Sequence, residues 1–263
     1  MLSDLNDDTI TEFISWTVSS GLSHATANCR RATLLAIWRY AVKRGLLPAV
    51  PRDVEKVKEL RRLPEAWTME ELGSIIETAR RKKRKKSGLP CPVGMWWEAF
   101  ILVAYDTGLR LRAMLGIKRT GWNPERREIT ATAEVQKHKV QQTFVVSEQA
   151  AEAVNRVLAN WQTVSDDDTT LFHWPIGVDQ LHRQYKDILL SAGVYRGPKD
   201  GFHKLRRTSA SHLAKAMGME AASRQLGHSS VQMTHRYVDP RMMGDHNAAQ
   251  HLPRPILPPK RSS

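Results

Sequence analysis

The chain has 263 residues, 41% of them hydrophobic, and a formal net charge of +13 with a pI near 10.0. This length fits one large domain or two smaller ones, and the charge favours a polyanionic partner, either nucleic acid or an anionic membrane surface. No apolar run approaches the roughly 18 residues of a membrane span, and the acidic start MLSDLNDDTITEF predicts no secretory signal. Cys29 and Cys91 are too few and too far apart for a disulfide framework, so we expect a reducing, cytoplasmic setting.

Two helices are predicted before residue 48. The first lies in DDTITEFISWTVSSGL, where Asp and Thr caps precede apolar residues at Ile10, Phe13 and Ile14. The second begins at the Ser23 cap and ends at Gly45. Its polar face carries charge of nearly one sign, which favours contact with DNA phosphates over a merely solvated face. The basic residues assigned to this contact are Arg30, Arg31, Arg39 and Lys43.

A domain boundary is expected near Pro64. Residues 48–67 contain two prolines early and one late, which predicts a linker with a helical middle. A new helix starts at Thr68, which can form a capping box with Glu71. Seven consecutive basic residues follow at 80–86, typical either of an exposed loop or of an element that tracks a DNA backbone. The candidates for that second DNA contact are Lys82, Lys83, Arg84 and Lys85.

The rest of the chain is predicted to be mainly α with one small antiparallel sheet. A buried helix, a break at Gly108 and a second helix are expected in MWWEAFILVAYDTGLRLRAMLGI. Alternating β-branched residues predict a hairpin from REITATAEV and QQTFVVS, with QKHK between the strands. Four helical segments follow: SEQAAEAVNRVLANWQ, GVDQLHRQYKDILLSAGV, FHKLRRTSASHLAKAMG and MEAASRQLGH. The proline-rich end, HLPRPILPPKRSS, predicts an extended tail.

Polar residues interrupt three apolar helical segments. Arg110 ends YDTGLR, His203 and Arg206 share GFHKLRRTSASHLA, and Tyr237 follows His228 by nine residues. Any one of them could be an ion-paired or capping residue, because buried Arg and His are costly unless paired. Together, two arginines can bind one phosphate, two histidines can hold a proton and one tyrosine can attack phosphorus. The sequence has no acidic cluster for Mg²⁺, so we expect no metal and no cofactor, with the arginines offsetting charge in the transition state.

The motifs TGLR, H-x-L-R-x-T and LGHSS followed by T-x-x-Y resemble the signature of tyrosine recombinases, the phage-integrase family. Order and spacing agree, from the first arginine through a hairpin lysine to the tyrosine, over residues 68–240. The resemblance implies a mainly α fold with a small three-stranded antiparallel sheet. It also implies two domains: a truncated helical core-DNA-binding (SAM-like) domain with its linker at 1–64, and a catalytic domain with a C-terminal tail at 65–263.

The resemblance assigns a role to each polar residue. Arg110 and Arg206 would hold the scissile phosphate, and His228 would hydrogen-bond it. His203 would act as general base or proton acceptor. Tyr237 would attack phosphorus and form a 3′-phosphotyrosyl link, so that rejoining the strand needs neither ATP nor a metal. In this interpretation the helix break before His228 lets that side chain point into the site.

A hairpin lysine would protonate the leaving 5′ oxygen. Lys137 is the candidate when the strand FVVSEQA is used to count back, and Lys139 is the alternative. The family usually has an acidic residue three positions after its first arginine, where this chain has Ala113. The N-terminal part resembles only the last two helices of the family's core-binding domain. These two departures favour an alternative function, a DNA-binding module of the same family with little or no catalysis, whereas the complete polar set argues against it.

The predicted function is site-specific breakage and rejoining of DNA strands, as in recombination or integration. A type IB topoisomerase-like enzyme and a metal-dependent nuclease are further alternatives, the last disfavoured by the lack of clustered carboxylates. The expected partner is double-stranded DNA, and we expect four copies of the protein to bind two paired DNA sites as a homotetramer. We expect no membrane association and a nucleoid-associated setting in a prokaryotic or phage-encoded context. After Tyr237, RMMGDHNAAQHL is predicted to form a short helix that either docks on a neighbouring protomer or frays.

Overall fold

The chain forms two compact units, Met1–Arg62 and Leu63–Ser263, and each buries its own hydrophobic core. The structure is a computed structural model. The residues that it describes are 5–59, 63–83, 89–137, 139–161 and 169–244. Within these ranges, no helix combines the length and the apolar character needed to cross a bilayer.

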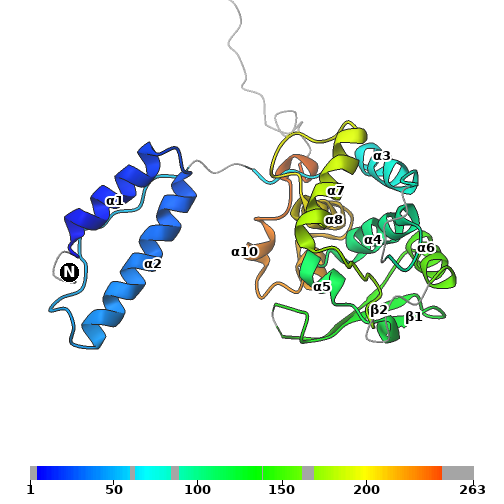
Figure 1. The fold of residues 1–263 in the computed structure, drawn as a ribbon, viewed down its shortest axis with the longest axis horizontal. Helices are drawn as coiled ribbons and strands as arrows, with labels where there is room; N and C mark the ends of the chain where they lie inside the picture. The colour runs from blue at the N-terminus through cyan, green and yellow to red at the C-terminus, as the bar shows by residue number, and fades with distance from the viewer. Residues whose placement is uncertain (1–4, 60–62, 84–88, 138, 162–168, 245–263) are drawn as a thin grey trace, which may run out of the picture. The chain divides into compact units, whose positions relative to one another are not determined.

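The first unit is a pair of helices that lie side by side (Figure 1). Helix α1 (Asp7–Ser19) begins at Asn6, whose side chain accepts a hydrogen bond from the Thr9 amide. Helix α2 (His24–Lys43) begins at Ser23, whose hydroxyl caps the Thr26 amide as the sequence predicts. Their facing surfaces bury Ile10, Ile14, Ala27, Leu35 and Trp38.

The predicted helical middle of the linker is wrong for residues 48–59, which have no helix in the structure. This stretch returns along α2, whose side chains take up its backbone groups. The Asn28 amide donates to the Val57 carbonyl at 2.8 Å and accepts from the Val57 amide at 3.0 Å. Arg31 Nε donates to the Val54 carbonyl at 2.8 Å. These tertiary hydrogen bonds replace the ones that a helix would have made within itself.

The second unit is mainly helical, and α4 runs through its centre. Because nearly every residue of α4 is apolar, it is buried on almost all sides and packs against α3, α6 and α8 (Figure 1). The helices of this unit are α3 (Met69–Arg80), α4 (Val93–Thr107), α5 (Leu111–Leu115), α6 (Glu148–Ala159), α7 (Val178–Ser191), α8 (Phe202–Met217), α9 (Met219–Leu226) and α10 (Val231–Thr234), with 3₁₀ turns η2 (Arg119–Gly121) and η3 (Pro240–Met242).

A small antiparallel sheet completes the second unit. Its strands β1 (Trp122–Asn123), β2 (Glu128–Ala131) and β3 (Gln142–Val145) follow one another in space in the order of the sequence. Ile129 lies opposite Phe144, and both side chains are buried in the main core. The predicted fold class, mainly α with a three-stranded antiparallel sheet, is confirmed.

An aromatic cluster fixes the start of α8. The ring of Phe202, the first residue of this helix, stacks on Tyr185 with centroids 4.3 Å apart and on Trp97 at 6.2 Å. Stacked aromatic rings bury large areas and prefer a restricted geometry. The helix that follows therefore starts from a rigid point, and its next residue is His203.

Candidate active site

Helix α8 carries two of the predicted polar residues on one face. His203 and Arg206 are three positions apart, so their side chains lie on the same side of the helix. Arg206 is only 3% exposed, whereas His203 lies at the surface. The imidazole of His203 therefore faces solvent, whereas the guanidinium of Arg206 is buried.

Two helix ends hold the Arg206 guanidinium. Nη1 donates to the Gly108 carbonyl at the end of α4, and Nη2 donates to the Leu226 carbonyl at the end of α9 at 2.9 Å. The last carbonyls of a helix have no partner within it and carry the negative end of the helix dipole. Both helices terminate in a left-handed glycine, Gly108 with φ 61° and Gly227 with φ 62°. The predicted break at Gly108 and the predicted helix end at Gly227 are confirmed.

No carboxylate pairs with Arg206 among the residues that the structure describes. Burial, together with the charge of Arg110, lowers the pKa of Arg206 to about 10, so the guanidinium stays protonated at neutral pH. Its Nε is buried and has no hydrogen-bond partner in the described part of the chain. A buried cation with only neutral acceptors has capacity for an added anion.

His228 lies between Arg206 and Thr234. Its Nε2 is 3.2 Å from Arg206 Nη2, and its Nδ1 is 2.9 Å from Thr234 Oγ1. An arginine can only donate, so Nε2 accepts, and Nδ1 carries the hydrogen that is donated to the Thr234 hydroxyl. Thr234 is fully buried in α10, so its hydroxyl fixes the orientation of the His228 imidazole.

Tyr237 brings a hydroxyl-bearing ring to these groups. Its backbone amide donates to the Thr234 carbonyl at 2.8 Å, which turns the chain back after α10. The ring centroid lies 5.0 Å from that of His203 and 4.7 Å from that of His228, and Arg206 Cζ lies 5.3 Å from it. One phenol is thus surrounded by two imidazoles and one guanidinium of the same chain.

Arg110 occupies the N-cap position of α5, directly after the break at the end of α4. Its side chain is half-buried, and the guanidinium forms no hydrogen bond or ion pair with the described residues. Its charge contributes to lowering the pKa values of both His203 and Arg206, so it acts electrostatically on both residues. Arg110 is therefore a second cation at the site with donors to spare.

The surroundings of His203 favour its neutral form. Partial desolvation comes first, and the charges of Arg207, Arg206 and Arg110 add to it, lowering the pKa of His203 to about 4. The imidazole is therefore neutral in the free protein at physiological pH. A neutral imidazole can accept a proton, and the nearest aromatic hydroxyl belongs to Tyr237.

The predicted hairpin lysine lies in the sheet region of the second unit. Lys137 is exposed on the connection between β2 and β3. Beside it, Gln136 is buried, and its amide donates to Gln142 Oε1 at 2.9 Å. Lys139, the alternative, has φ 56° and donates its backbone amide to the Gln136 carbonyl. The assignment of the proton donor to Lys137 stays a prediction.

The residues predicted to contact DNA differ in their surroundings. Arg39 and Lys43 are exposed on α2 and Arg30 is half-buried, whereas the guanidinium of Arg31 bonds the Val54 carbonyl and so supports the returning linker. In the basic run, Lys83 is exposed and Lys82 half-buried, and Arg84 and Lys85 lie outside the described residues.

The first residue of that basic run has a structural partner. Arg80 pairs with Glu98 at 2.7 Å, and the same buried carboxylate receives Arg156 at 2.7 Å. Arg80 thus belongs to an ion-pair cluster on α4 and cannot be counted with the free cations of the run. The sequence gives no sign of this, because the three partners are 18 and 58 positions apart.

Two further residues of the site are missed by sequence reasoning. Thr234 orients His228, and Gln142 on β3 lies against Gly227, where an added Cβ would be 3.0 Å from Gln142 Oε1. The T-x-x-Y spacing contains Thr234, so a signal was present, but nothing marks Gln142. Ala113 is buried in the core, as expected for an apolar residue at the position where the family has an acid.

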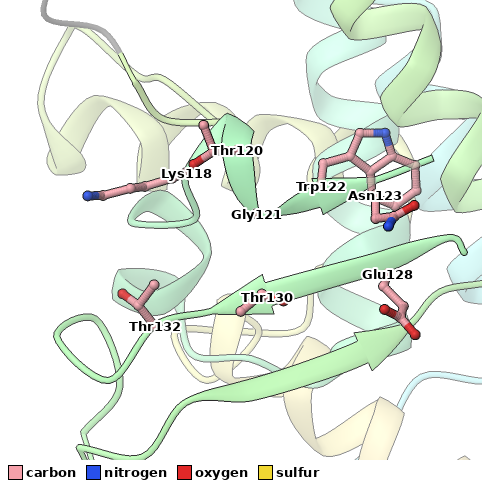
Figure 2. Close-up of a pocket in the computed structure, with 8 residues that line it drawn as sticks. All are labelled: Lys118, Thr120, Gly121, Trp122, Asn123, Glu128, Thr130 and Thr132. Atoms are coloured by element: carbon pink, nitrogen blue, oxygen red, sulfur yellow. The ribbon is translucent and has the colours of Figure 1, made fainter. Parts of the chain in front are cut away.

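The structure also has a hollow of about 360 Å³ on the sheet, away from the residues above (Figure 2). Figure 2 shows Lys118 and Thr120 on one side of it and the side chains of β2 on another. None of the six predicted catalytic residues lines it. Among the described residues, no group of three or more His, Cys, Asp or Glu is placed to hold a metal ion.

Known proteins share this sequence pattern and this fold. The model of the phage integrase family matches residues 67–243. Tyrosine recombinase XerC of Actinobacillus pleuropneumoniae serotype 7 (strain AP76) is 23% identical over 239 residues, covering 89% of this chain and 74% of the relative. XerC of Corynebacterium glutamicum is 26% identical over 237 residues, covering 88% and 72%.

Solved structures agree in fold. XerH site-specific recombinase bound to palindromic difH substrate matches with a TM-score of 0.76 at 20% identity, covering 95% of this chain and 73% of that one. The Tn1549 transposon integrase in complex with transposon right end DNA matches with a TM-score of 0.73 at 17% identity, covering 94% and 84%. Because the family model spans more than half of the sequence, the chain belongs to the phage integrase family, the tyrosine-type site-specific recombinases.

Proposed function

We propose that the chain breaks and rejoins DNA strands at specific sites through a 3′-phosphotyrosyl intermediate on Tyr237. The observation that carries the proposal is the position of the Tyr237 ring, which packs against His203, His228 and Arg206 of its own chain. A phenol, a neutral imidazole and guanidinium donors together are what attack on a phosphodiester requires.

In the proposed reaction, Arg110 and Arg206 bind the non-bridging oxygens of the scissile phosphate and offset the charge of the transition state. His228, held by Thr234, hydrogen-bonds the same phosphate. His203 accepts the proton of Tyr237 as the phenolic oxygen bonds to phosphorus and the bond to the 5′ oxygen breaks.

A proton must also reach the leaving 5′ oxygen, and we assign that step to Lys137. The released 5′ hydroxyl then attacks the phosphotyrosyl bond in the reverse reaction, which rejoins a strand and frees Tyr237. The bond energy is kept in the covalent intermediate, so neither step needs a nucleotide cofactor. The charge that a metal would offset is offset here by the two arginines.

Duplex DNA is the substrate we propose, held as two paired sites by a homotetramer. The basic residues support this. The first unit contributes Arg30, Arg39 and Lys43, and the second contributes Lys82 and Lys83. Cations at a protein surface bind DNA phosphates because this binding releases counterions from the DNA. The solved recombinases and integrases with the same fold are complexes with DNA in the two cases described above.

The test uses a nicked suicide duplex that carries the native flanking sequence, in buffer with EDTA. The wild-type chain should give a covalent protein–DNA adduct on a denaturing gel, and Tyr237→Phe should bind the duplex but give none. Tyr40→Phe is the matched control, because that tyrosine is 62% exposed on α2 and should leave the adduct unchanged. An adduct formed by Tyr237→Phe would contradict the assignment of the nucleophile.

A second candidate function is DNA binding by this fold with little or no cleavage. The observation in its favour is Ala113, a buried apolar residue where the family has a carboxylate. Sequence-specific gel shifts by the wild-type chain, with no adduct at any duplex concentration, would favour this candidate over the first.

A further inference from the structure

The chain just after Tyr237 is fixed to the helix that carries His203 and Arg206. Val238 and Asp239 are 4% and 3% exposed. The Asp239 amide donates to Ser211 Oγ at 2.8 Å, and that hydroxyl donates to the Arg207 carbonyl at 2.8 Å. Ser211 is fully buried in α8. The backbone two residues beyond the proposed nucleophile is therefore anchored to the same helix, five positions after Arg206 and eight after His203.

The Asp239 carboxylate makes a second set of contacts. Oδ2 accepts from the Ala66 amide at 3.2 Å and from Arg241 Nη2 at 2.6 Å. Oδ1 accepts from the Arg241 amide at 3.0 Å and from Arg241 Nε at 2.9 Å. Burial alone would raise the pKa of Asp239, but the hydrogen bonds from Arg241 and Ala66 hold it below its ordinary value. Each oxygen of the carboxylate thus accepts two hydrogen bonds, and the group joins two parts of the second unit that are distant in sequence.

Its partner Ala66 lies in a short segment that is itself docked on α8. The Trp67 amide donates to Thr208 Oγ1 at 3.0 Å, and the Trp67 carbonyl lies 3.0 Å from His212 Nε2. Lys204, buried with Asp200 at 2.7 Å, has its ammonium 5.1 Å from the centroid of the Trp67 ring. The start of the second unit is therefore rigidly placed, which makes it a firm support for Asp239.

We infer that Asp239 is a positioning residue for Tyr237. Its backbone amide ties the chain beyond the proposed nucleophile to α8, and its carboxylate ties the same chain to the first residues of the second unit, so that the phenol is held at the His203–Arg206 face. The carboxylate tie is the one that a substitution at this position removes. The inference rests on the proposed function of Tyr237 as nucleophile. A role limited to capping η3 would use the Arg241 amide alone, whereas the contacts to Ala66 and Ser211 reach outside that turn.

The kinetic test is single-turnover cleavage of the suicide duplex at saturating DNA. Asp239→Ala should lower the cleavage rate constant by about 10- to 100-fold, the range expected when a reacting group is displaced by about 1 Å, while the dissociation constant for DNA stays unchanged. Asp239→Asn, which keeps the shape and one acceptor, should retain more activity than Asp239→Ala. Asp239→Asn also serves as the test variant if the alanine variant does not fold.

Glu98→Gln is the matched control. Glu98 is equally buried and also joins two segments through arginines, but it is not linked to the chain around Tyr237. With each variant assayed at the same margin below its melting temperature, Glu98→Gln should cleave at the wild-type rate. An equal loss of cleavage in both variants, or no loss in Asp239→Ala, would overturn the inference.

A second readout does not depend on cleavage. Protein labelled with 3-fluorotyrosine gives a fluorine resonance for Tyr237, assigned by its absence in Tyr237→Phe. That resonance should shift or broaden in Asp239→Ala and stay in place in Glu98→Gln. An unchanged Tyr237 resonance in Asp239→Ala would overturn the inference. If the wild-type chain forms no DNA adduct at all, the proposed function falls, and the fluorine spectra still decide whether Asp239 positions this ring.

Discussion

Partial burial of His203, together with three nearby guanidinium groups, determines the protonation state of its imidazole. In water a histidine titrates near pH 6.5, so half of such groups would be protonated there and unable to accept a proton. Desolvation and the charges of Arg207, Arg206 and Arg110 lower the pKa of His203 to about 4. The free enzyme therefore holds a ready acceptor over the whole physiological range.

A pH titration checks this. In an imidazole NMR titration of the free protein, His203 should titrate with a midpoint near 4. Arg110→Ala should raise that midpoint, since one of the repelling charges is gone, and Arg156→Ala, which removes a cation paired with Glu98, should not. A wild-type midpoint near 6.5 would show that the charges around His203 are screened.

The same shift has a consequence for stability. Between about pH 4 and 6.5 the unfolded chain binds a proton at His203 that the folded chain does not. Stability contributed by this group is therefore present above pH 6.5 and is lost as pH falls toward 4.

At the scale of elements, the ends of α4 and α9 build the pocket for Arg206. Gly227 has φ 62°, and an added Cβ would meet Gln142 at 3.0 Å from Oε1 and 3.1 Å from Nε2. Gly108 has φ 61°, and a Cβ there would lie 2.7 Å from Leu226 Cδ2. Both glycines are needed for two reasons, the left-handed backbone and the close approach of a neighbouring side chain.

Gly227→Ala should therefore lower the free energy of unfolding by more than the strain of a left-handed alanine backbone alone. Gly193→Ala is the control, because Gly193 has φ 70° and open space at its Cβ position. We expect Gly193→Ala to lower the free energy of unfolding by about 1 kcal/mol and Gly227→Ala by about 2 kcal/mol, measured by urea denaturation. Only Gly227→Ala should also impair cleavage, since His228 follows it. Equal losses of stability in the two variants would mean that the Gln142 side chain moves away from the added methyl group without loss of stability.

The connection between β2 and β3 carries both candidates for the proton donor. Lys137→Ala should abolish cleavage of ordinary DNA and recover on a duplex with a 5′-bridging phosphorothiolate, because a thiolate leaves without being protonated. Lys139→Ala should cleave ordinary DNA, since that residue serves the turn through its backbone. The measurement is adduct formation on the two duplexes. Loss and rescue in Lys139→Ala instead would reverse the assignment.

Local signals in the sequence are enough for most of these elements. The capping box of Thr68 and Glu71, the Ser23 cap and the break at Gly108 all form as predicted, because each depends on residues within a few positions. The helical linker is wrong because its backbone groups are taken by α2, and nothing in residues 48–59 encodes that partner. The tie between Asp239 and Ala66 is equally hidden, since the two are 173 positions apart.

At the scale of the whole molecule, the proposed nucleophile and the groups proposed to act on it belong to one chain. Tyr237, His203, His228 and Arg206 meet within the second unit, so we expect each chain to cleave DNA with its own tyrosine. Of the helix predicted in RMMGDHNAAQHL, only residues 241–244 are described, and the first two of them belong to the η3 turn; the rest lies outside the described residues.

Mixing inactive variants tests this arrangement. Tyr237→Phe lacks the nucleophile and Arg206→Ala lacks a phosphate ligand, so an equal mixture of the two should give no DNA adduct on paired sites. If a protomer lent its tyrosine to its neighbour, the mixture would contain complete sites and the adduct would return. A mixture of wild type and Tyr237→Phe, which should cleave, controls for assembly.

The buried charge of Arg206 has a consequence for the folded protein as a whole. A guanidinium that is 3% exposed, without a carboxylate partner in the described part of the chain, lowers the stability of the free fold. The phosphate that it is proposed to bind supplies the missing anion, and a ligand that binds only the folded state stabilises it by mass action. In this proposal the free protein lacks one anion beside Arg206, and the phosphate of bound DNA would supply it. If Arg206 acts in cleavage as proposed, it is a residue that the stability of the free fold alone would not favour.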